Sequence, residues 1–318
     1  MRRPPFPPFD EFSALAKVLT AEAAHQYPLK ERVVIREEQI QTAMVRFNYA
    51  VAGSGSPVVL VPGSGGWRLT FERMVERLAA NHTVYAVDPP GQGETRVTGA
   101  GFGFGTDAVA TALADFIAVS GLKTVPVVGH SWGGGFALRL AQLYPTRVQR
   151  LAVLAPAGVV ARDAWEFRAL RIPVVGELAA RFTTAASVRH MLLKSFSNTQ
   201  QLPSRQLINQ AAHQLRDAPD AAALRRDMLA IERGVTWDAV EQELQTVMCP
   251  VLILWGDKDR YLPVAVLDRL RAGLPNAETH LISGAGHSVH DDAAPNDIYP
   301  RLQRFLTDLP HQAATATQ

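Results

Sequence analysis

Short apolar runs alternate with longer segments of helical periodicity along most of this chain. The runs are mostly continuous, without the polar–apolar alternation of strands that keep one face in water. The pattern predicts strands at 32–40, 42–51, 58–61, 82–87, 125–128, 150–154, 251–255 and 278–282. It predicts helices at 69–80, 107–119, 133–143, 264–272 and 297–309. We therefore expect an α/β fold: a mostly parallel twisted sheet flanked by helices.

The alternation stops after Pro156 and resumes near residue 250. The intervening residues contain no convincing strand, and apolar side chains such as Leu224, Met228 and Ile231 recur at helical spacing. We interpret this stretch as a helical cap inserted into the sheet-forming part of the chain. The predicted division is an N-terminal arm at 1–31, an α/β core at 32–157 and 246–309, a helical cap at 158–245 and a tail at 310–318.

The arm opens with prolines and continues with Phe9, Phe12, Leu15 and Leu19 at near-helical spacing. We expect a short amphipathic helix packed on the same chain; a homodimer contact and a cover over the site are the alternatives. The N-terminus lacks the apolar region of a secretory signal, and no run reaches the 18 apolar residues of a membrane span. The expectation is a cytoplasmic protein without a membrane partner.

Composition narrows the class of protein. Of 318 residues, 47% are hydrophobic and 19% are charged, which excludes a mainly disordered chain. The net charge of +2 argues against a nucleic-acid partner, because such surfaces carry clustered basic charge. The single cysteine, Cys249, excludes an intrachain disulfide, and the spacing of histidines and carboxylates matches no metal motif. We expect a small-molecule substrate, no metal and no organic cofactor.

The strongest chemical signal is the sequence Gly-His-Ser-Trp-Gly at residues 129–133. It follows a predicted strand at once and opens a predicted helix, which is the context of a nucleophile elbow. The tight turn strains the serine backbone and leaves room only for small residues two positions before and after it. We expect Ser131 to present its hydroxyl at a helix N-terminus, where negative charge is favoured.

Serine needs a base and an orienting acid, and both follow in the chain order of this motif. Asp257 and Asp259 come just past the strand at 251–255, and His287 comes just past the last strand. We expect Ser131, Asp259 and His287 to be the catalytic residues. Asp257 is the competing acid.

Two other histidines compete with His287. His280 lies within a predicted strand, where a surface or packing role is expected, and His290 follows the glycine loop, where it could line the rim of the site. His287 comes directly after Gly284-Ala285-Gly286, which gives its backbone room to reach the serine.

With these motifs in order, the chain resembles serine hydrolases of the α/β-hydrolase fold superfamily that carry a helical cap. The resemblance covers residues 32–309 and includes the sequence Asp-Pro-Pro-Gly-Gln-Gly at 88–93, which is similar to the family turn after the fourth strand. The family commonly has His-Gly after its third strand, whereas Pro62 stands at that position here. The resemblance implies an oxyanion hole formed by the amides of Ser64 and Trp132, with Gly65 as the alternative to Ser64.

The expected pocket lies between the sheet and the helical insertion. The candidate substrate contacts are the bulky apolar residues Trp67, Phe167, Leu170, Phe182 and Met191. We expect hydrolysis of a carboxylic ester of a small to medium, largely apolar substrate through an acyl-enzyme. Two alternatives remain open: a carbon–carbon bond hydrolase or specialised natural-product enzyme with the same residues, and a ligand-binding receptor with little turnover.

Overall fold

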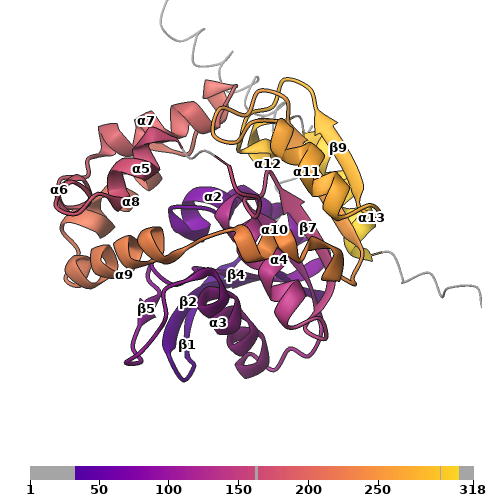
Figure 1. Ribbon diagram of the computed structural model, residues 1–318, viewed down its shortest axis with the longest axis horizontal. Coiled ribbons are helices and arrows are strands. Elements are labelled where there is room, and N and C mark those ends of the chain that lie inside the picture. The colour runs from indigo at the N-terminus through magenta and orange to yellow at the C-terminus, as the bar shows by residue number, and fades with distance from the viewer. Residues whose placement is uncertain (1–32, 162–163, 294, 308–318) are drawn as a thin grey trace, which may run out of the picture. The chain divides into compact units, whose positions relative to one another are not determined.

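The computed structural model describes residues 33–161, 164–293 and 295–307 (Figure 1). The predicted arm at 1–31 and the tail at 310–318 lie outside the described residues. The strands are β1 (Ile35–Gln41), β2 (Val45–Ala52), β3 (Ser56–Val61), β4 (His82–Val87), β5 (Arg96–Val97), β6 (Val125–His130), β7 (Val148–Leu154), β8 (Val251–Gly256) and β9 (Glu278–Ile282).

These strands form one sheet with the order β1-β2-β4-β3-β6-β7-β8-β9, and β5 pairs with β2. The ladders from β4 through β3, β6, β7 and β8 to β9 are parallel, whereas β2 pairs antiparallel with β1, β4 and β5. Every residue of β6 and β8 is buried, as the continuous apolar runs predict. The expected α/β fold with a mostly parallel sheet is confirmed.

The described helices lie between and after the strands, beginning after β3. They are α2 (Gly66–Leu78), α3 (Thr106–Val119), α4 (Trp132–Leu143), α5 (Trp165–Arg171), α6 (Val175–Arg181), α7 (Ala185–Ser195), α8 (Arg205–Arg216), α9 (Ala221–Gly234), α10 (Asp238–Gln242), α11 (Ala265–Gly273), α12 (Val289–Asp292) and α13 (Pro295–Thr307). The connection from β7 to β8 holds α5 to α10, and its described residues contain no strand. We call residues 165–246 the helical segment.

The core packs α3 and α4 against the sheet. Phe116 of α3 and Phe136 of α4 are fully buried, and Phe116 contacts the rings of Phe47 and Tyr49 on β2. Burying one such side chain contributes about 2–3 kcal/mol. This packing holds β6 and α4 rigidly, so the turn between them, where Ser131 lies, has a fixed position.

Candidate active site

Ser131 occupies a strained turn between β6 and α4. Its backbone has φ 52° and ψ −122°, outside the usual regions for a residue with a side chain. A Cβ atom at Gly129 would meet the Gly134 backbone at 2.7 Å, and one at Gly133 would collide with the carbonyl oxygen of Val61. Glycine is therefore required at 129 by the close approach of α4 and at 133 by the close approach of β3, as the sequence predicts.

A chain of hydrogen bonds joins three side chains that are far apart in the sequence. The Ser131 hydroxyl and His287 Nε2 lie 2.8 Å apart, and His287 Nδ1 lies 2.7 Å from Asp259 Oδ2. An Nδ1–H that donates to the carboxylate leaves Nε2 to accept the serine proton. The Asp259 side chain is fully buried and that of His287 is 6% exposed, so water competes little for these contacts.

The two acids after β8 have different surroundings. Asp259 Oδ1 accepts the backbone N–H groups of Tyr261 (2.8 Å) and Leu262 (3.0 Å), which fixes its other oxygen toward His287. Asp257 instead accepts the Gly284 N–H at 2.7 Å and stabilises the loop after β9. The geometry thus selects Asp259 over Asp257 as the partner of the imidazole.

The loop that carries His287 is tied to the helical segment by Asp292. One carboxylate oxygen of Asp292 accepts the N–H groups of Gly286 (2.6 Å) and Ser197 (2.7 Å) and the Ser197 hydroxyl (2.6 Å). The other oxygen accepts the Asn198 N–H at 2.7 Å. Because Asp292 bridges the loop and the residues after α7, it fixes the backbone directly before His287. No motif or spacing in the sequence points to this role of Asp292.

His130 holds the backbone of His287 through a hydrogen bond. Its Nε2–H donates to the His287 carbonyl oxygen at 3.1 Å, and its ring centroid lies 4.7 Å from that of His290. Burial, with the neighbouring histidines, lowers the pKa of His130 well below its ordinary value, so the ring stays neutral. His290 is also buried and donates to the Thr70 carbonyl oxygen at 2.8 Å, so it packs behind the site and does not line its rim. His280 pairs with Glu278 away from the site.

The loop after β3 leaves two backbone amides free. The N–H groups of Gly66 and Trp67 donate to Gln92 and Asp88, at 3.1 and 2.8 Å. Among the described residues, no partner is recorded for the N–H of Ser64 or Gly65. Ser64, Gly65 and Trp132, the first residue of α4, line the same pocket as Ser131. These amides are the available donors for a developing oxyanion.

Ser131 and His287 open into a cavity of about 510 Å³ between the strand ends and the helical segment. Its walls are largely apolar and include Trp132, whose ring stacks on Phe167 at 6.4 Å. The described residues that line it include no lysine or arginine, and the carboxylates among them are Glu166 and Glu232. Lys194 pairs with Glu166 at 3.0 Å, and Arg171 pairs with Glu232 at 3.2 Å.

Three of the predicted substrate contacts, Phe167, Leu170 and Met191, line this cavity. Trp67 and Phe182 do not. Trp67 is 2% exposed, because the first turn of α2 turns its ring into the core. Phe182 ends α6 and is 67% exposed. Tyr261 and Trp237, which the sequence analysis did not select, belong to the walls.

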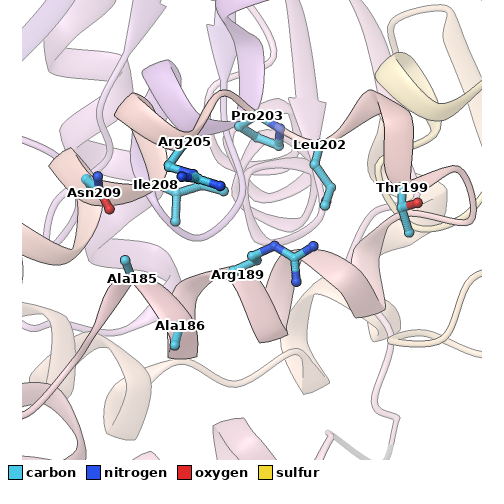
Figure 2. A pocket seen from close by; sticks show the side chains of 9 residues that line it. All are labelled: Ala185, Ala186, Arg189, Thr199, Leu202, Pro203, Arg205, Ile208 and Asn209. Carbon is cyan, nitrogen blue, oxygen red and sulfur yellow. The ribbon is translucent and has the colours of Figure 1, made fainter.

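A second hollow of about 430 Å³ lies between α7 and α8 (Figure 2). Arg189 of α7 and Arg205 at the start of α8 reach over it from the two helices. The part of its lining that the structure describes includes no histidine, cysteine or carboxylate and so offers no general base. In the described residues there is no cluster of three or more potential metal ligands, and no helix long and apolar enough to cross a membrane.

The comparisons with known proteins agree with this architecture. Residues 56–294 match the family model for the α/β-hydrolase fold, which covers more than two thirds of the chain. The protein therefore belongs to the α/β-hydrolase superfamily, as the motifs predict.

Proteins of similar sequence or structure carry names that describe different activities, or none. An uncharacterized protein of Mycobacterium tuberculosis is 29% identical over 81% of this chain and 77% of its own length. A 2-hydroxy-6-oxononadienedioate/2-hydroxy-6-oxononatrienedioate hydrolase of Paraburkholderia phymatum is 28% identical, over 76% of this chain and 85% of its own. The crystal structure of a bacterial membrane phospholipase A is 25% identical, with a TM-score of 0.69 over 94% of this chain and 92% of its own.

Proposed function

We propose that this protein is a serine hydrolase that cleaves a carboxylic ester of a small to medium, largely apolar substrate through an acyl-enzyme. The observation that carries the proposal is the hydrogen-bond chain from Ser131 through His287 to Asp259, which opens into an apolar cavity. A nucleophile that faces the cavity, joined to a base and an orienting acid in this order, matches the requirements of acyl transfer.

In the first half of the reaction, Ser131 Oγ attacks the carbonyl carbon while His287 Nε2 takes the hydroxyl proton. The carbonyl oxygen becomes an anion that accepts hydrogen bonds from the amides of Trp132 and Ser64. Losing one such donor costs about 3 kcal/mol of barrier in comparable sites. The ester C–O bond then breaks, the alcohol leaves with the proton from His287, and the acyl group stays on Ser131.

Water completes the cycle. His287 takes a proton from the attacking water, and the tetrahedral intermediate collapses as the imidazolium returns a proton to Ser131 Oγ. The carboxylic acid leaves and the enzyme is restored. Asp259 holds Nδ1–H throughout, which keeps the required tautomer and stabilises the imidazolium.

The charge of the cavity favours a neutral substrate. Burying a carboxylate without a cation or sufficient hydrogen bonds costs several kcal/mol, and none of the described residues that line this cavity is a lysine or an arginine. The substrate named for the Paraburkholderia relative is a dioate with two carboxylates. Similarity to that relative nevertheless makes hydrolysis of a carbon–carbon bond in a diketone-like substrate the second candidate function.

We also propose that the helical segment acts as a cap. The cavity takes part of its wall from α5 to α9, for example Leu170, Ala180, Met191 and Leu215, and the rest from loops at the strand ends. A wall built largely by one inserted segment can set substrate size without changing the hydrogen-bonded residues.

A substrate panel tests the proposal. We expect kcat/KM for neutral short and medium p-nitrophenyl esters to exceed that for 2-hydroxy-6-oxo dienedioates by at least about 100-fold. Ser131→Ala should abolish turnover, whereas Ser283→Ala, at an exposed serine after β9, should keep it. The reverse substrate preference would favour the carbon–carbon bond hydrolase. Tight binding of ligands without turnover of any ester would favour the receptor.

A further inference from the structure

The outer surface of α5 and α6 carries an unusual concentration of bulky apolar side chains. Of the twelve large hydrophobic residues exposed in the described part of the chain, six fall between residues 165 and 182, and the others are scattered. We call these six the α5–α6 apolar surface: Trp165, Ile172, Val174, Val175, Leu178 and Phe182. Trp165 also lines the cavity, so it lies where the two surfaces meet. Single exposed apolar residues are common, but a cluster of this kind marks an interaction site.

Helical spacing places most of this surface on one side of α6. Val175 and Leu178 are three residues apart, and Phe182 follows Leu178 by four, so their side chains neighbour one another. Ala180 lies on the opposite side of α6, where it is buried and lines the cavity. In Figure 1, α6 lies at the outer end of the helical segment. A short helix that is apolar on both sides has a second apolar environment to meet besides the cavity.

The turn before α6 adds a second, independent observation. Val174 has φ +68°, a left-handed conformation that is strained for a β-branched residue. Its side chain is 67% exposed. Because the Val174 side chain points into water, packing within the protein does not offset the backbone strain. This arrangement therefore fits a contact outside the chain.

The charges around this surface are mostly positive. Residues 165–195 contain five lysines and arginines against two glutamates. Arg168 of α5 and Arg181 of α6 are exposed and have no carboxylate partner among the described residues. Arg181 lies over the Phe182 ring, 6.0 Å from its centroid. Apolar side chains bordered by free arginines are the combination that binds an anionic lipid surface.

We propose that the α5–α6 apolar surface docks on an anionic phospholipid bilayer, with its apolar side chains in the headgroup region and the free arginines near the phosphates. This contact is peripheral, since no described helix can cross a membrane. It replaces the expectation from the sequence that the protein has no membrane partner, and it goes beyond the proposed reaction.

Tryptophan fluorescence tests the contact directly. Trp165 is 65% exposed, whereas the other four tryptophans of the chain are at most 9% exposed. Vesicles of phosphatidylglycerol and brominated phosphatidylcholine should therefore quench part of the emission of the full-length protein, and Trp165→Phe should lose that component. Unquenched emission at saturating lipid would overturn the proposal.

A matched pair of variants distinguishes binding through this surface from nonspecific adsorption to vesicles. We expect Val174→Asp/Leu178→Asp to weaken co-sedimentation with anionic vesicles about tenfold or more, because two charges enter the apolar contact. Aspartate tolerates positive φ, so the variant should fold. Met248→Asp changes an equally exposed apolar residue elsewhere and should bind like the wild type. Equal binding of all three proteins would overturn the proposal.

Other occupants predict different results. If a second copy covers the surface, light scattering will show a dimer that the double variant dissociates, and vesicles will not bind. If residues 1–31 cover it, the full chain will not bind vesicles but a chain without those residues will. Either result overturns membrane docking.

An activity measurement extends the test. The double variant should lose kcat/KM on an ester carried in anionic vesicles and keep it on a soluble ester, because Val174 and Leu178 do not line the cavity. Equal losses on both esters would contradict a docking role. Only this measurement rests on the proposed function, so vesicle binding and hydrolysis can fail separately.

Discussion

Replacing Asp292 with alanine tests whether contacts with the helical segment hold the loop that carries His287 in place. The Asp292 carboxylate accepts four hydrogen bonds between 2.6 and 2.7 Å, three of them from backbone N–H groups. Asp292 is only 9% exposed, so water reaches it poorly. Asp292→Ala removes every acceptor at once and leaves the amides of Gly286, Ser197 and Asn198 without partners.

The expected loss can be worked from these contacts. Each buried donor left without a partner costs about 1–3 kcal/mol, and partial relaxation reduces the sum, so we expect about 4 kcal/mol of unfolding free energy. For a chain of this size, each kcal/mol shifts Tm by about 2 °C, which predicts a fall of about 8 °C. Because a displacement of about 1 Å at a catalytic group costs on the order of 100-fold, kcat should fall by that amount with little change in KM.

Asp257→Ala is the matched control, since Asp257 accepts one amide of the same loop and its side chain is 27% exposed. We expect a loss of about 1 kcal/mol, or about 2 °C in Tm, and nearly unchanged kcat. Calorimetry and ester kinetics on both variants make the comparison. If the two variants lose equal stability and activity, or if Asp292→Ala matches the wild type, then the reasoning about this loop is wrong.

Two further predictions concern other carboxylates. Asp259→Asn keeps an acceptor for the amides of Tyr261 and Leu262 but presents an NH₂ group to His287, which favours the wrong tautomer of the imidazole. We therefore expect kcat to fall by about 10³-fold or more without loss of Tm. An unchanged kcat would refute this role of Asp259. Burial raises the pKa of Asp88 from 3.8 to about 6. The folded state therefore binds this proton more tightly than the unfolded state, and the unfolding free energy contributed by Asp88 falls by about 3 kcal/mol as pH rises from 4 to above 6. Urea denaturation at several pH values should show this decline in the wild type and a flatter profile in Asp88→Asn, and parallel profiles would speak against it.

The sequence alone predicted those parts of the structure that depend on a local rule. The apolar runs located the parallel strands, and Gly129 and Gly133 marked the turn of Ser131 because only glycine fits against β3 and α4. His287 and Asp259 could be selected because both follow strands of one parallel sheet, whose carboxyl ends meet at one edge. The short strand β5 was missed, since two residues give no periodic signal.

Contacts between distant segments could not be predicted from the sequence. Asp292 acts through Ser197 and Asn198, about 95 residues away, and no spacing rule relates them. The directions of Trp67 and Phe182 depend on how α2 and α6 are rotated, and an apolar side chain on a helix fits the core, the cavity or the surface equally well by composition. The breaks between α5, α6 and α7 decide which residues line the cavity.

Covalent labelling tests the central claim most directly. The full-length protein is treated with a fluorophosphonate, digested and analysed by mass spectrometry, beside Ser131→Ala and His287→Ala. The account predicts one stoichiometric adduct, on Ser131, absent from Ser131→Ala and formed far more slowly in His287→Ala. An adduct on another residue, or labelling of Ser131 at the same rate without the imidazole, would contradict it.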